Sequence, residues 1–312
     1  WNNGHFMHQF TYFIGDVNFY YIDEDGNKKT AVMKTGDSMY ITPFVPHTFS
    51  TRKNAEENGL ILALTYGDKL VGDVKQELAC LSSELATKFS LDFSSKEKSS
   101  GSLINFHREI SSVTLTELSK RTNIPKEILL KIEQGDILPS TVELEILAKS
   151  LNVNTRELLP NDIKEKQVVI KTHDECNSWT YPDDSDRYVF TELASTSALA
   201  FSKALEIKVQ DSLSTEYDLQ IGLHQYVYNV GSTKLSLNWE LEGKSYIEQI
   251  NPGDSIYIKP FVKHNFRGNG NLVALRIGGK IPGDSQRELS TLGNKNASRA
   301  INETKLWFNA GN

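Results

Sequence analysis

Two segments of this chain, far apart in the sequence, are variants of each other. Residues 36–49 read GDSMYITPFVPHTF, and residues 253–266 read GDSIYIKPFVKHNF. Upstream of each segment lies a matching His-Gln pair, at positions 8–9 and 224–225. An internal repeat of this kind means that one structural unit occurs twice. The fold must therefore accommodate two copies of that unit, and each copy serves as a comparison for the other.

Short segments rich in β-branched and aromatic residues make up each copy. In the first copy they cover residues 9–13, 17–22, 38–41 and 60–65, and turn-forming residues separate them, as in the Glu-Asp-Gly-Asn run at 24–27. Short strands bounded by turn residues are typical of an antiparallel barrel or jelly roll. The repeat therefore predicts two such β domains in a chain of 312 residues.

A helical region separates the two copies. Residues 94–102 (SSKEKSSGS) predict a flexible linker, and the polar residues 161–166 predict a second one. Between them, the segments 116–121, 126–134 and 141–150 carry apolar residues at helical spacing. We therefore expect a compact all-helical domain between the β domains.

The second copy has a longer run of residues ahead of its His-Gln pair than the first. We expect the native protein to continue upstream of Trp1, because a barrel without its first strands would expose unpaired edges. The predicted boundaries are 1–72 for the C-terminal part of the first β domain, 73–102 for a helix and the linker, 103–160 for the helical domain, 167–282 for a degenerate second β domain, and 283–312 for a C-terminal helical segment.

Composition argues against several classes of protein. The chain has two cysteines, Cys80 and Cys176, so neither a disulfide scaffold nor a thiolate metal cage is expected, and the reducing cytoplasm is the expected compartment. No apolar run approaches the length needed to span a membrane. A net charge of −6 disfavours binding of nucleic acid over the whole surface.

The two copies differ at residues that are able to bind a metal. Gln9 and His47 have counterparts of the same type in the second copy, whereas His5 is replaced there by Ile221. Two imidazoles and one oxygen donor predict a divalent metal site with open coordination positions in the first copy. A regular strand would hold His5 and Gln9 about 13 Å apart, so a bulge or a strong twist is needed to bring them together. His8 is expected on the opposite face, as a hydrogen-bonded core residue.

The spacing of Gly, Pro and His in residues 36–47, together with the four-residue step from His5 to Gln9, resembles the two motifs of the cupin family. The helical region resembles the helix-turn-helix domain of phage-repressor type. These resemblances imply an α+β fold with two cupin-type β-barrels, each a double-stranded β-helix, separated by an all-helical helix-turn-helix-like domain.

Tandem cupins interleaved with a repressor-like domain resemble the phosphonate-processing dioxygenases. The spacing of Asn2, His5 and Gln9, followed by Pro-Phe-Val-Pro-His at 43–47, is similar to the branch of this family that makes methylphosphonate. The resemblance implies Fe(II) held by His5, Gln9 and His47, dioxygen as co-substrate, and cleavage of the C–C bond of 2-hydroxyethylphosphonate to methylphosphonate and CO2 or bicarbonate. Members with Glu in place of Gln9 make hydroxymethylphosphonate and formate, which is the alternative. A homo-oligomer is also expected.

The family further implies substrate-binding roles for two residues. Asn2 would donate a hydrogen bond to a phosphonate oxygen, and Ile41 would shape the pocket beside the metal; a turn residue and a core residue are the respective alternatives. A phosphonate dianion also requires Lys or Arg. Lys34, Arg52 and Lys53 are candidates but could equally be surface charges, and the family supplies a lysine and a tyrosine from sequence upstream of this chain.

A transcription regulator is the alternative from another class, since a repressor-like domain joined to a cupin also occurs there. The expected recognition helix, KEILLKIE at 126–133, is balanced in charge, and residues 108–157 hold seven basic and eight acidic residues. Such a surface supports phosphate binding poorly, so nucleic acid is not an expected partner. We expect the helical domain to be a scaffold. A metal-dependent isomerase would share the metal ligands without requiring oxygen, and the ligands alone do not identify the metal.

Overall fold

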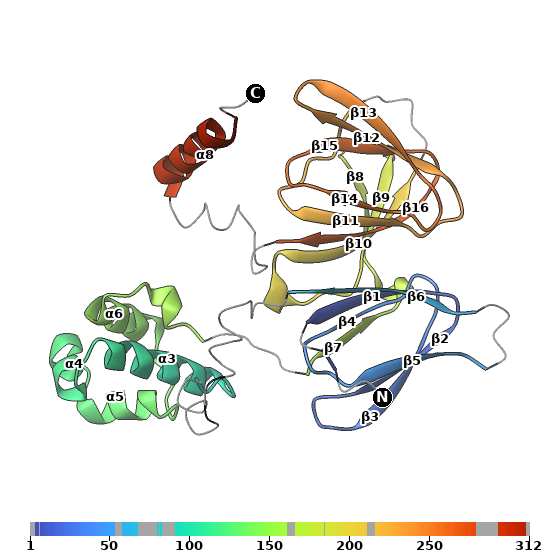
Figure 1. The fold of residues 1–312 in the computed structure, drawn as a ribbon. Helices are drawn as coiled ribbons and strands as arrows, with labels where there is room; N and C mark the ends of the chain where they lie inside the picture. Colours follow the sequence, from blue (N-terminus) through green and yellow to red (C-terminus); the bar gives the residue numbers. More distant parts are fainter. Residues whose placement is uncertain are drawn as a thin grey trace. The chain divides into compact units, whose positions relative to one another are not determined.

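The computed structural model describes residues 4–5, 7–53, 58–67, 80, 82, 91–160, 166–183, 185–210, 216–278 and 293–309. It is a mixed α and β structure that divides into two compact units (Figure 1). One unit comprises Trp1–Lys69 and Glu165–Asn312, and the other comprises Leu70–Lys164. The first unit contains the strands and the second contains a group of helices, as the sequence predicts.

The first copy of the repeat forms two antiparallel sheets, with strand orders β6-β1-β4-β7 and β3-β2-β5. We call these two sheets the first sheet pair. Its strands are β1 (His8–Ile14), β2 (Val17–Ile22), β3 (Lys28–Met33), β4 (Ser38–Ile41), β5 (His47–Thr51), β6 (Leu60–Tyr66) and β7 (Val168–Lys171).

The second copy forms the second sheet pair, with strand orders β14-β11-β16-β10-β9-β8 and β13-β12-β15. Its strands are β8 (Ser178–Tyr181), β9 (Tyr188–Glu192), β10 (Ser202–Val209), β11 (His224–Asn229), β12 (Leu235–Leu241), β13 (Lys244–Ile250), β14 (Ser255–Ile258), β15 (Lys263–Arg267) and β16 (Gly270–Ile277). Two short 3-10 helices, His173–Glu175 and Ser197–Leu199, lie on connections in this part of the chain.

The strand β7 corrects the predicted start of the second β domain at residue 167. It pairs with β4 of the first sheet pair, with Ser38 opposite Lys171 and Ile41 opposite Val168. Without β7 the backbone groups on that side of β4 would have no ladder partner, and an unpaired edge invites association with other chains. The later part of the chain therefore completes a sheet of the first copy, and the second sheet pair begins at β8.

Three apolar clusters hold this unit together. One lies inside the first sheet pair and includes Phe13 and Ile41, and a second lies inside the second sheet pair and includes Ile207. The third joins the two pairs and combines Tyr12 of β1 with Leu275 of β16. Because successive side chains on a strand point to opposite faces, each of these strands contributes to an inner core and to the shared one.

The helical unit contains α4 (Leu115–Thr122), α5 (Lys126–Glu133) and α6 (Thr141–Leu151), which agree with the three predicted helical segments. Side-chain caps define two of their starts: the Thr114 hydroxyl accepts from the backbone of Glu117, and Ser140 forms a capping box with Glu143. A 3-10 helix, Thr155–Glu157, follows α6. Apolar residues from every helix of this group form one core, which includes Ile104, Leu118, Leu129, Ile132 and Leu147.

The predicted linker at 94–102 is wrong, because Ser95 caps a helix, α3 (Lys96–Ile110), that runs through most of it. Its small residues pack closely. Ser100 is fully buried and its hydroxyl donates to the carbonyl of Leu158 at 2.8 Å, and a Cβ on Gly101 would lie 2.2 Å from the carbonyl oxygen of Ile132. In the sequence the small residues of this segment suggest flexibility. In the structure they are small because larger side chains do not fit between α3 and α5.

The remaining predicted segments are described only in part. The helix α8 (Gly293–Asn309) lies within the predicted C-terminal helical segment 283–312. Most of the predicted helix after residue 73, and residues 161–165 of the second predicted linker at 161–166, lie outside the described residues. Within the described part of the chain, every helix is too short or too polar to cross a bilayer.

Candidate metal centre

His5 and Gln9 meet because the chain bends before β1 begins. Gly4 has φ of +85°, and a Cβ at this position would lie 2.6 Å from the backbone carbon of Phe44, so only glycine fits. The Phe44 amide donates to the carbonyl of His5 at 2.9 Å, which anchors the bend. As a result Nε2 of His5 lies 2.7 Å from Oε1 of Gln9. The predicted departure from a regular strand is therefore present, ahead of the strand rather than within it.

His47 completes the cluster from the first position of β5. Its ring centroid lies 5.4 Å from that of His5, with the two rings perpendicular. In each histidine Nδ1 faces a backbone carbonyl, that of Met7 at 2.7 Å from His5 and that of Val45 at 2.8 Å from His47. A carbonyl only accepts, so both Nδ1 atoms carry a proton, and Nε2 is the nitrogen of each ring that is available to a metal ion. Burial, with the neighbouring His5, lowers the pKa of His47 and keeps its ring neutral.

The amide of Gln9 is oriented by its own strand. Its Nε2 donates to the Thr11 hydroxyl at 2.9 Å, which leaves Oε1 directed at His5. Nε2 of His5 and Oε1 of Gln9 lie 2.7 Å apart, close enough for both to bind the same cation. Two imidazole nitrogens and an amide oxygen are ligands for a divalent first-row metal ion. Among the described residues no three His, Cys, Asp or Glu side chains gather into a metal site, so the amide is needed for the set.

Ile41 lies directly opposite Gln9 on β4 and is fully buried. It packs in the inner core with Phe13 and Met39. Phe19 and Phe49 belong to the same cluster, and their ring centroids lie 6.5 and 5.7 Å from that of His47. The nitrogen and oxygen atoms that could bind a metal therefore lie next to a group of apolar side chains that includes Ile41. Asn2 lies outside the described residues.

The candidate basic residues lie away from this cluster. Arg52 forms an ion pair with Asp16 at 3.7 Å, and the register of β2 with β5 places it beyond Thr51, at the opposite end of the sheet from His47. Lys34 follows β3 at that same end, and Lys53 is exposed. These three residues are surface charges and do not form a phosphonate clamp.

The second copy repeats the backbone of the site. The Phe261 amide donates to the carbonyl of Ile221 at 2.8 Å, as Phe44 does at the first site, and both phenylalanines have positive φ. His264 repeats the contact of its counterpart, with Nδ1 donating to the carbonyl of Val262 at 2.8 Å. The alignment of His5 with Ile221 is thus confirmed by hydrogen bonds and not by sequence alone.

The side chains at the second site differ from those at the first by one further residue, which the comparison of the two sequences missed. Oε1 of Gln225 accepts from Nε of Arg276 at 3.0 Å. Arg276 is the cross-strand partner of Gln225 on β16, and Thr65 is the partner of Gln9 on β6, so these two residues correspond. A guanidinium cation therefore stands beside the second Gln. The sequence feature that could have identified Arg276 is its position as a lone basic residue at the end of the apolar strand sequence GNLVALRI.

His8 and His224 have the structural role predicted for them. Nδ1 of His8 lies 2.5 Å from the Tyr40 hydroxyl, and Nδ1 of His224 lies 2.6 Å from the Tyr257 hydroxyl. Both pairs are stacked as well as hydrogen bonded. Because this contact is present in both copies, it is part of the shared scaffold and does not distinguish one copy from the other.

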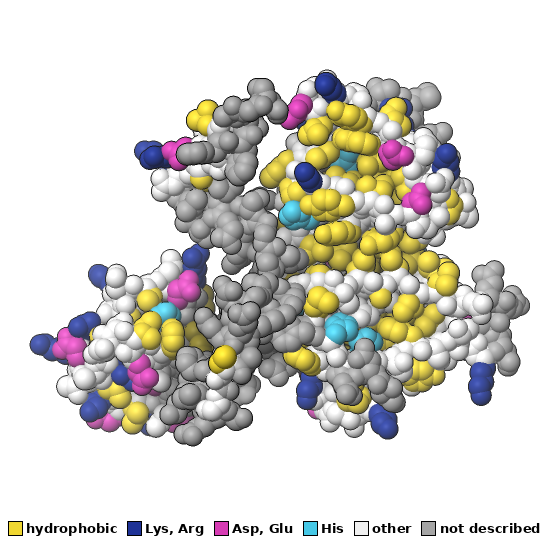
Figure 2. Space-filling model, viewed as in Figure 1, with side chains coloured by type: hydrophobic (Ala, Val, Ile, Leu, Met, Phe, Trp, Pro, Cys, Tyr) yellow, Lys and Arg dark blue, Asp and Glu magenta, His cyan; other side chains and the backbone are white. Residues whose placement is uncertain are grey.

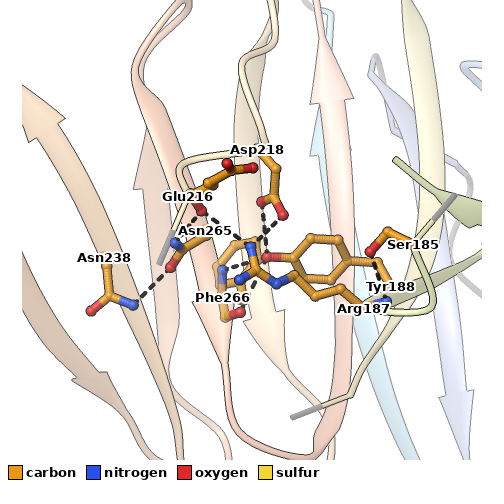
Figure 3. A network of polar contacts seen from close by, with 8 residues as sticks. All are labelled: Ser185, Arg187, Tyr188, Glu216, Asp218, Asn238, Asn265 and Phe266. Atoms are coloured by element: carbon orange, nitrogen blue, oxygen red, sulfur yellow. Dashed lines mark hydrogen bonds and ion pairs between the residues drawn. The ribbon is translucent and has the colours of Figure 1, made fainter. Parts of the chain in front are cut away.

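A polar network braces the second sheet pair (Figure 3). Arg187, which is 2% exposed, pairs with Asp218 and also donates to the carbonyl of Glu216. Tyr188 exchanges hydrogen bonds with the backbone of Phe266 at 3.0 and 3.1 Å. Figure 3 shows these groups converging on the segment that leads to Leu219, which is itself paired with His264. The network fixes that segment and leaves the charge of Arg187 compensated.

Hydrophobic side chains gather on the visible face of the strands (Figure 2). A cavity of about 500 Å³ lies where β6 and β11 approach each other. It is lined by aliphatic and aromatic residues: Leu64, Thr65, Tyr66, Gly67, His224, Tyr226, Tyr228, Tyr257, Leu275 and Ile277. Its histidine, His224, is hydrogen bonded through Nδ1 to the hydroxyl of Tyr257.

Comparison with known proteins gives one curated relative and several solved structures. No protein-family model matches the chain. It is 58% identical over 308 residues to methylphosphonate synthase of Nitrosopumilus maritimus, an alignment that covers 99% of this chain and 67% of that protein. The structure of Streptomyces albus HEPD with 2-hydroxyethylphosphonate and Fe(II) bound is similar at 31% identity and a TM-score of 0.80, covering 96% of this chain and 68% of that one. A variant of 2-hydroxyethylphosphonate dioxygenase, 21% identical with a TM-score of 0.76 over 96% and 71% of the two chains, shares the fold.

Proposed function

The chain belongs to the family of methylphosphonate synthase and the 2-hydroxyethylphosphonate dioxygenases, and from this premise we propose its reaction. It is an Fe(II)- and O2-dependent oxidoreductase that cleaves the C–C bond of 2-hydroxyethylphosphonate and releases methylphosphonate and CO2 or bicarbonate. The observation that carries this proposal is the donor set of the first sheet pair, in which an amide replaces the usual carboxylate. Hydroxymethylphosphonate with formate is the alternative outcome.

In this proposal Fe(II) is held by Nε2 of His5, Oε1 of Gln9 and Nε2 of His47. When bound, the ion supplies redox chemistry with dioxygen and coordination positions for the substrate oxygens. The carbonyls of Met7 and Val45 hold both imidazoles in the tautomer that coordinates. Thr11 holds the amide so that its oxygen, and not its nitrogen, faces His5.

The uncharged amide has a consequence for substrate binding. Two imidazoles and an amide leave the charge of a divalent ion uncompensated, whereas a carboxylate would cancel part of it. An anionic phosphonate restores the balance when it enters, so the pocket favours a dianionic substrate over a neutral one. In the proposed pocket Asn2 donates a hydrogen bond to a phosphonate oxygen. Ile41 and the phenylalanines around it exclude water, which protects reactive species from side reactions.

We also propose that the sheet pairs are cupin-type barrels, the second of them degenerate, and that the helical unit is a helix-turn-helix-like scaffold. Three of its basic residues are already paired with acids. Arg108 donates to both carboxylate oxygens of Glu133 at 2.6 and 2.8 Å, Arg121 donates to Glu117 at 2.8 Å, and Arg156 to its neighbour Glu157 at 2.9 Å. A regulator would need such cations free for phosphates. Sequence-selective retention of genomic DNA fragments in a gel shift at low salt would favour the regulator instead.

A homo-oligomer and a cytoplasmic location stay predictions. Light scattering coupled to size-exclusion chromatography tests the first, and fractionation of native cells tests the second.

The decisive experiment loads the protein anaerobically with Fe(II), adds oxygen and 2-hydroxyethylphosphonate, and reads the products by phosphorus NMR. A methylphosphonate signal is expected. Unchanged substrate in a protein with full iron content contradicts the proposal, and a hydroxymethylphosphonate signal selects the alternative.

Gln9→Glu is the informative variant. Its carboxylate should bind iron about tenfold more tightly, because its negative charge attracts the divalent ion and an uncharged amide does not. A shift of its products toward hydroxymethylphosphonate would tie the product branch to this residue.

A further inference from the structure

The second sheet pair contains an arginine, Arg276, that has no carboxylate partner among the described residues. Among the described residues, the one hydrogen bond of Arg276 runs from its Nε to Gln225, and its other close contact is with the ring of Phe190, 5.4 Å from Cζ. Phe190 belongs to the inner core, as do Leu272 and Ala274 on the same face of β16. The guanidinium therefore lies inside the sheet pair, and burial lowers its pKa to about 10. Four of its five N–H donors have no acceptor among the described residues.

Gln225 presents a second unused donor beside it. This residue is 2% exposed, and its Nε2 has no hydrogen-bond partner in the described structure. In the first copy the corresponding nitrogen, that of Gln9, donates to Thr11. A buried amide donor without an acceptor costs free energy, so an acceptor that binds beside Arg276 would also satisfy this donor.

Two other arginines that are buried or partly buried have a carboxylate partner. Arg187 is paired with Asp218 within the network of Figure 3, and Arg108 is paired with Glu133. Among the described residues no carboxylate is paired with Arg276, and the phenol of Tyr181 is the group whose charge interacts with it. The nearby His264 is 1% exposed, and burial, together with the positive charge of Arg276, lowers its pKa to about 4, so its ring is neutral and does not compensate the guanidinium.

We propose that Arg276 and Gln225 bind a small oxyanion at the position that corresponds to the metal centre of the first sheet pair. The guanidinium and the amide Nε2 offer N–H donors to the oxygens of a phosphate, a phosphonate or a bicarbonate ion. Arg276 is partly exposed, so such an ion reaches it from solvent. A water molecule would satisfy the amide but would not neutralise the guanidinium. The site takes an anion where the first copy takes a cation.

The test is a calorimetric titration of the full chain, stripped of metal by a chelator, in chloride buffer of constant ionic strength. Inorganic phosphate, methylphosphonate and bicarbonate are the three probes, and their order of affinity identifies the source of the anion. Saturable binding of at least one probe at millimolar concentration is expected. Arg276→Thr, which restores the residue of the first copy, should weaken it by roughly tenfold to a hundredfold, because hydrogen bonds to charged groups are among the stronger ones.

The controls separate this site from the first copy and from general charge. Lys263→Thr removes the same charge from an exposed residue next to His264 and should leave the affinity unchanged. His5→Ala should also leave it unchanged, since metal is absent throughout. Gln225→Glu supplies an internal carboxylate to Arg276 and should abolish binding even if Arg276→Thr does not fold. Absence of binding to all three probes, or equal affinity in the folded Arg276 and Gln225 variants, overturns the proposal.

Discussion

The two sheet pairs have the same backbone at the site but pockets of opposite electrostatic character. Both carry a Gln opposite a buried Ile, and both carry a His whose Nδ1 is held by a carbonyl. In the first pocket the side chains are two imidazoles and an amide, with no permanently charged group beside Gln9 among the described residues. In the second, Ile221 removes an imidazole and Arg276 supplies a permanent cation. The proposed metal site and the second pocket therefore differ by two substitutions on the same backbone framework.

Removal of an imidazole should have the largest effect. His5→Ala leaves one imidazole and one amide, so iron affinity should fall by more than about a hundredfold, beyond what loss of a supporting residue costs, and turnover should stop. Iron content after anaerobic loading and dialysis is the measurement. His264→Ala is the matched control and should retain full iron. Equal loss of iron from both variants would remove the asymmetry on which the comparison rests.

Acid should destabilise the second sheet pair through His264. Its pKa is lowered from 6.5 to about 4 in the folded protein by burial. The unfolded imidazole takes up a proton as the pH falls through about 6.5, and the folded one does so only near pH 4. The stability that the neutral His264 contributes is therefore fully present above about pH 6.5 and is lost as the pH falls from about 6.5 to about 4. A shift of this size corresponds to about 3 kcal/mol. Urea unfolding followed at a series of pH values should show the slope, and His264→Gln should flatten it; an unchanged slope contradicts the assignment.

Transfer of the arginine tests whether charge alone distinguishes the pockets. Thr65→Arg places a cation on β6 beside Gln9, at an exposed position. Like charges at about 4 Å repel by between about 1 kcal/mol in water and about 4 kcal/mol near a protein surface, so a loss of about 2 kcal/mol, or roughly thirtyfold, in iron affinity is expected. Thr65→Gln has similar bulk and no charge and serves as the control. Equal iron affinities in the two variants would show that size, and not charge, matters.

The smallest expected effect concerns the isoleucines that face the glutamines. Ile41→Val and Ile258→Val each remove one methylene from a buried side chain, and each should cost about 1 kcal/mol of unfolding free energy. The proposed pocket role of Ile41 adds a second effect, a change in the proportion of methylphosphonate among the products by phosphorus NMR. If both variants give the product distribution of the parent protein, Ile41 is a core residue and nothing more.

Much of the site could be predicted from the sequence, because its features are local or repeated. The step from His5 to Gln9, the loss of the first histidine at Ile221 and the scaffold role of His8 all follow from aligning one copy with the other. Four strands of the first copy, β1, β2, β4 and β6, and the helices α4 to α6 also agree with their predicted segments within a residue or so, since periodicity, turn residues and caps act over a few positions, whereas β3 and β5 were not predicted.

The sequence by itself determined that one β unit occurs twice, where its strands and turns lie, and that only the first copy keeps two imidazoles and an amide. The tertiary structure alone decided that β7 pairs with β4, that Gly101 packs against the carbonyl of Ile132, and that Arg276 lies inside its sheet pair beside Gln225. The physical reason is the sequence separation of the residues that interact. Strand partners, close backbone approaches and the burial of a charge depend on residues distant in the chain, and no local pattern of side chains records them.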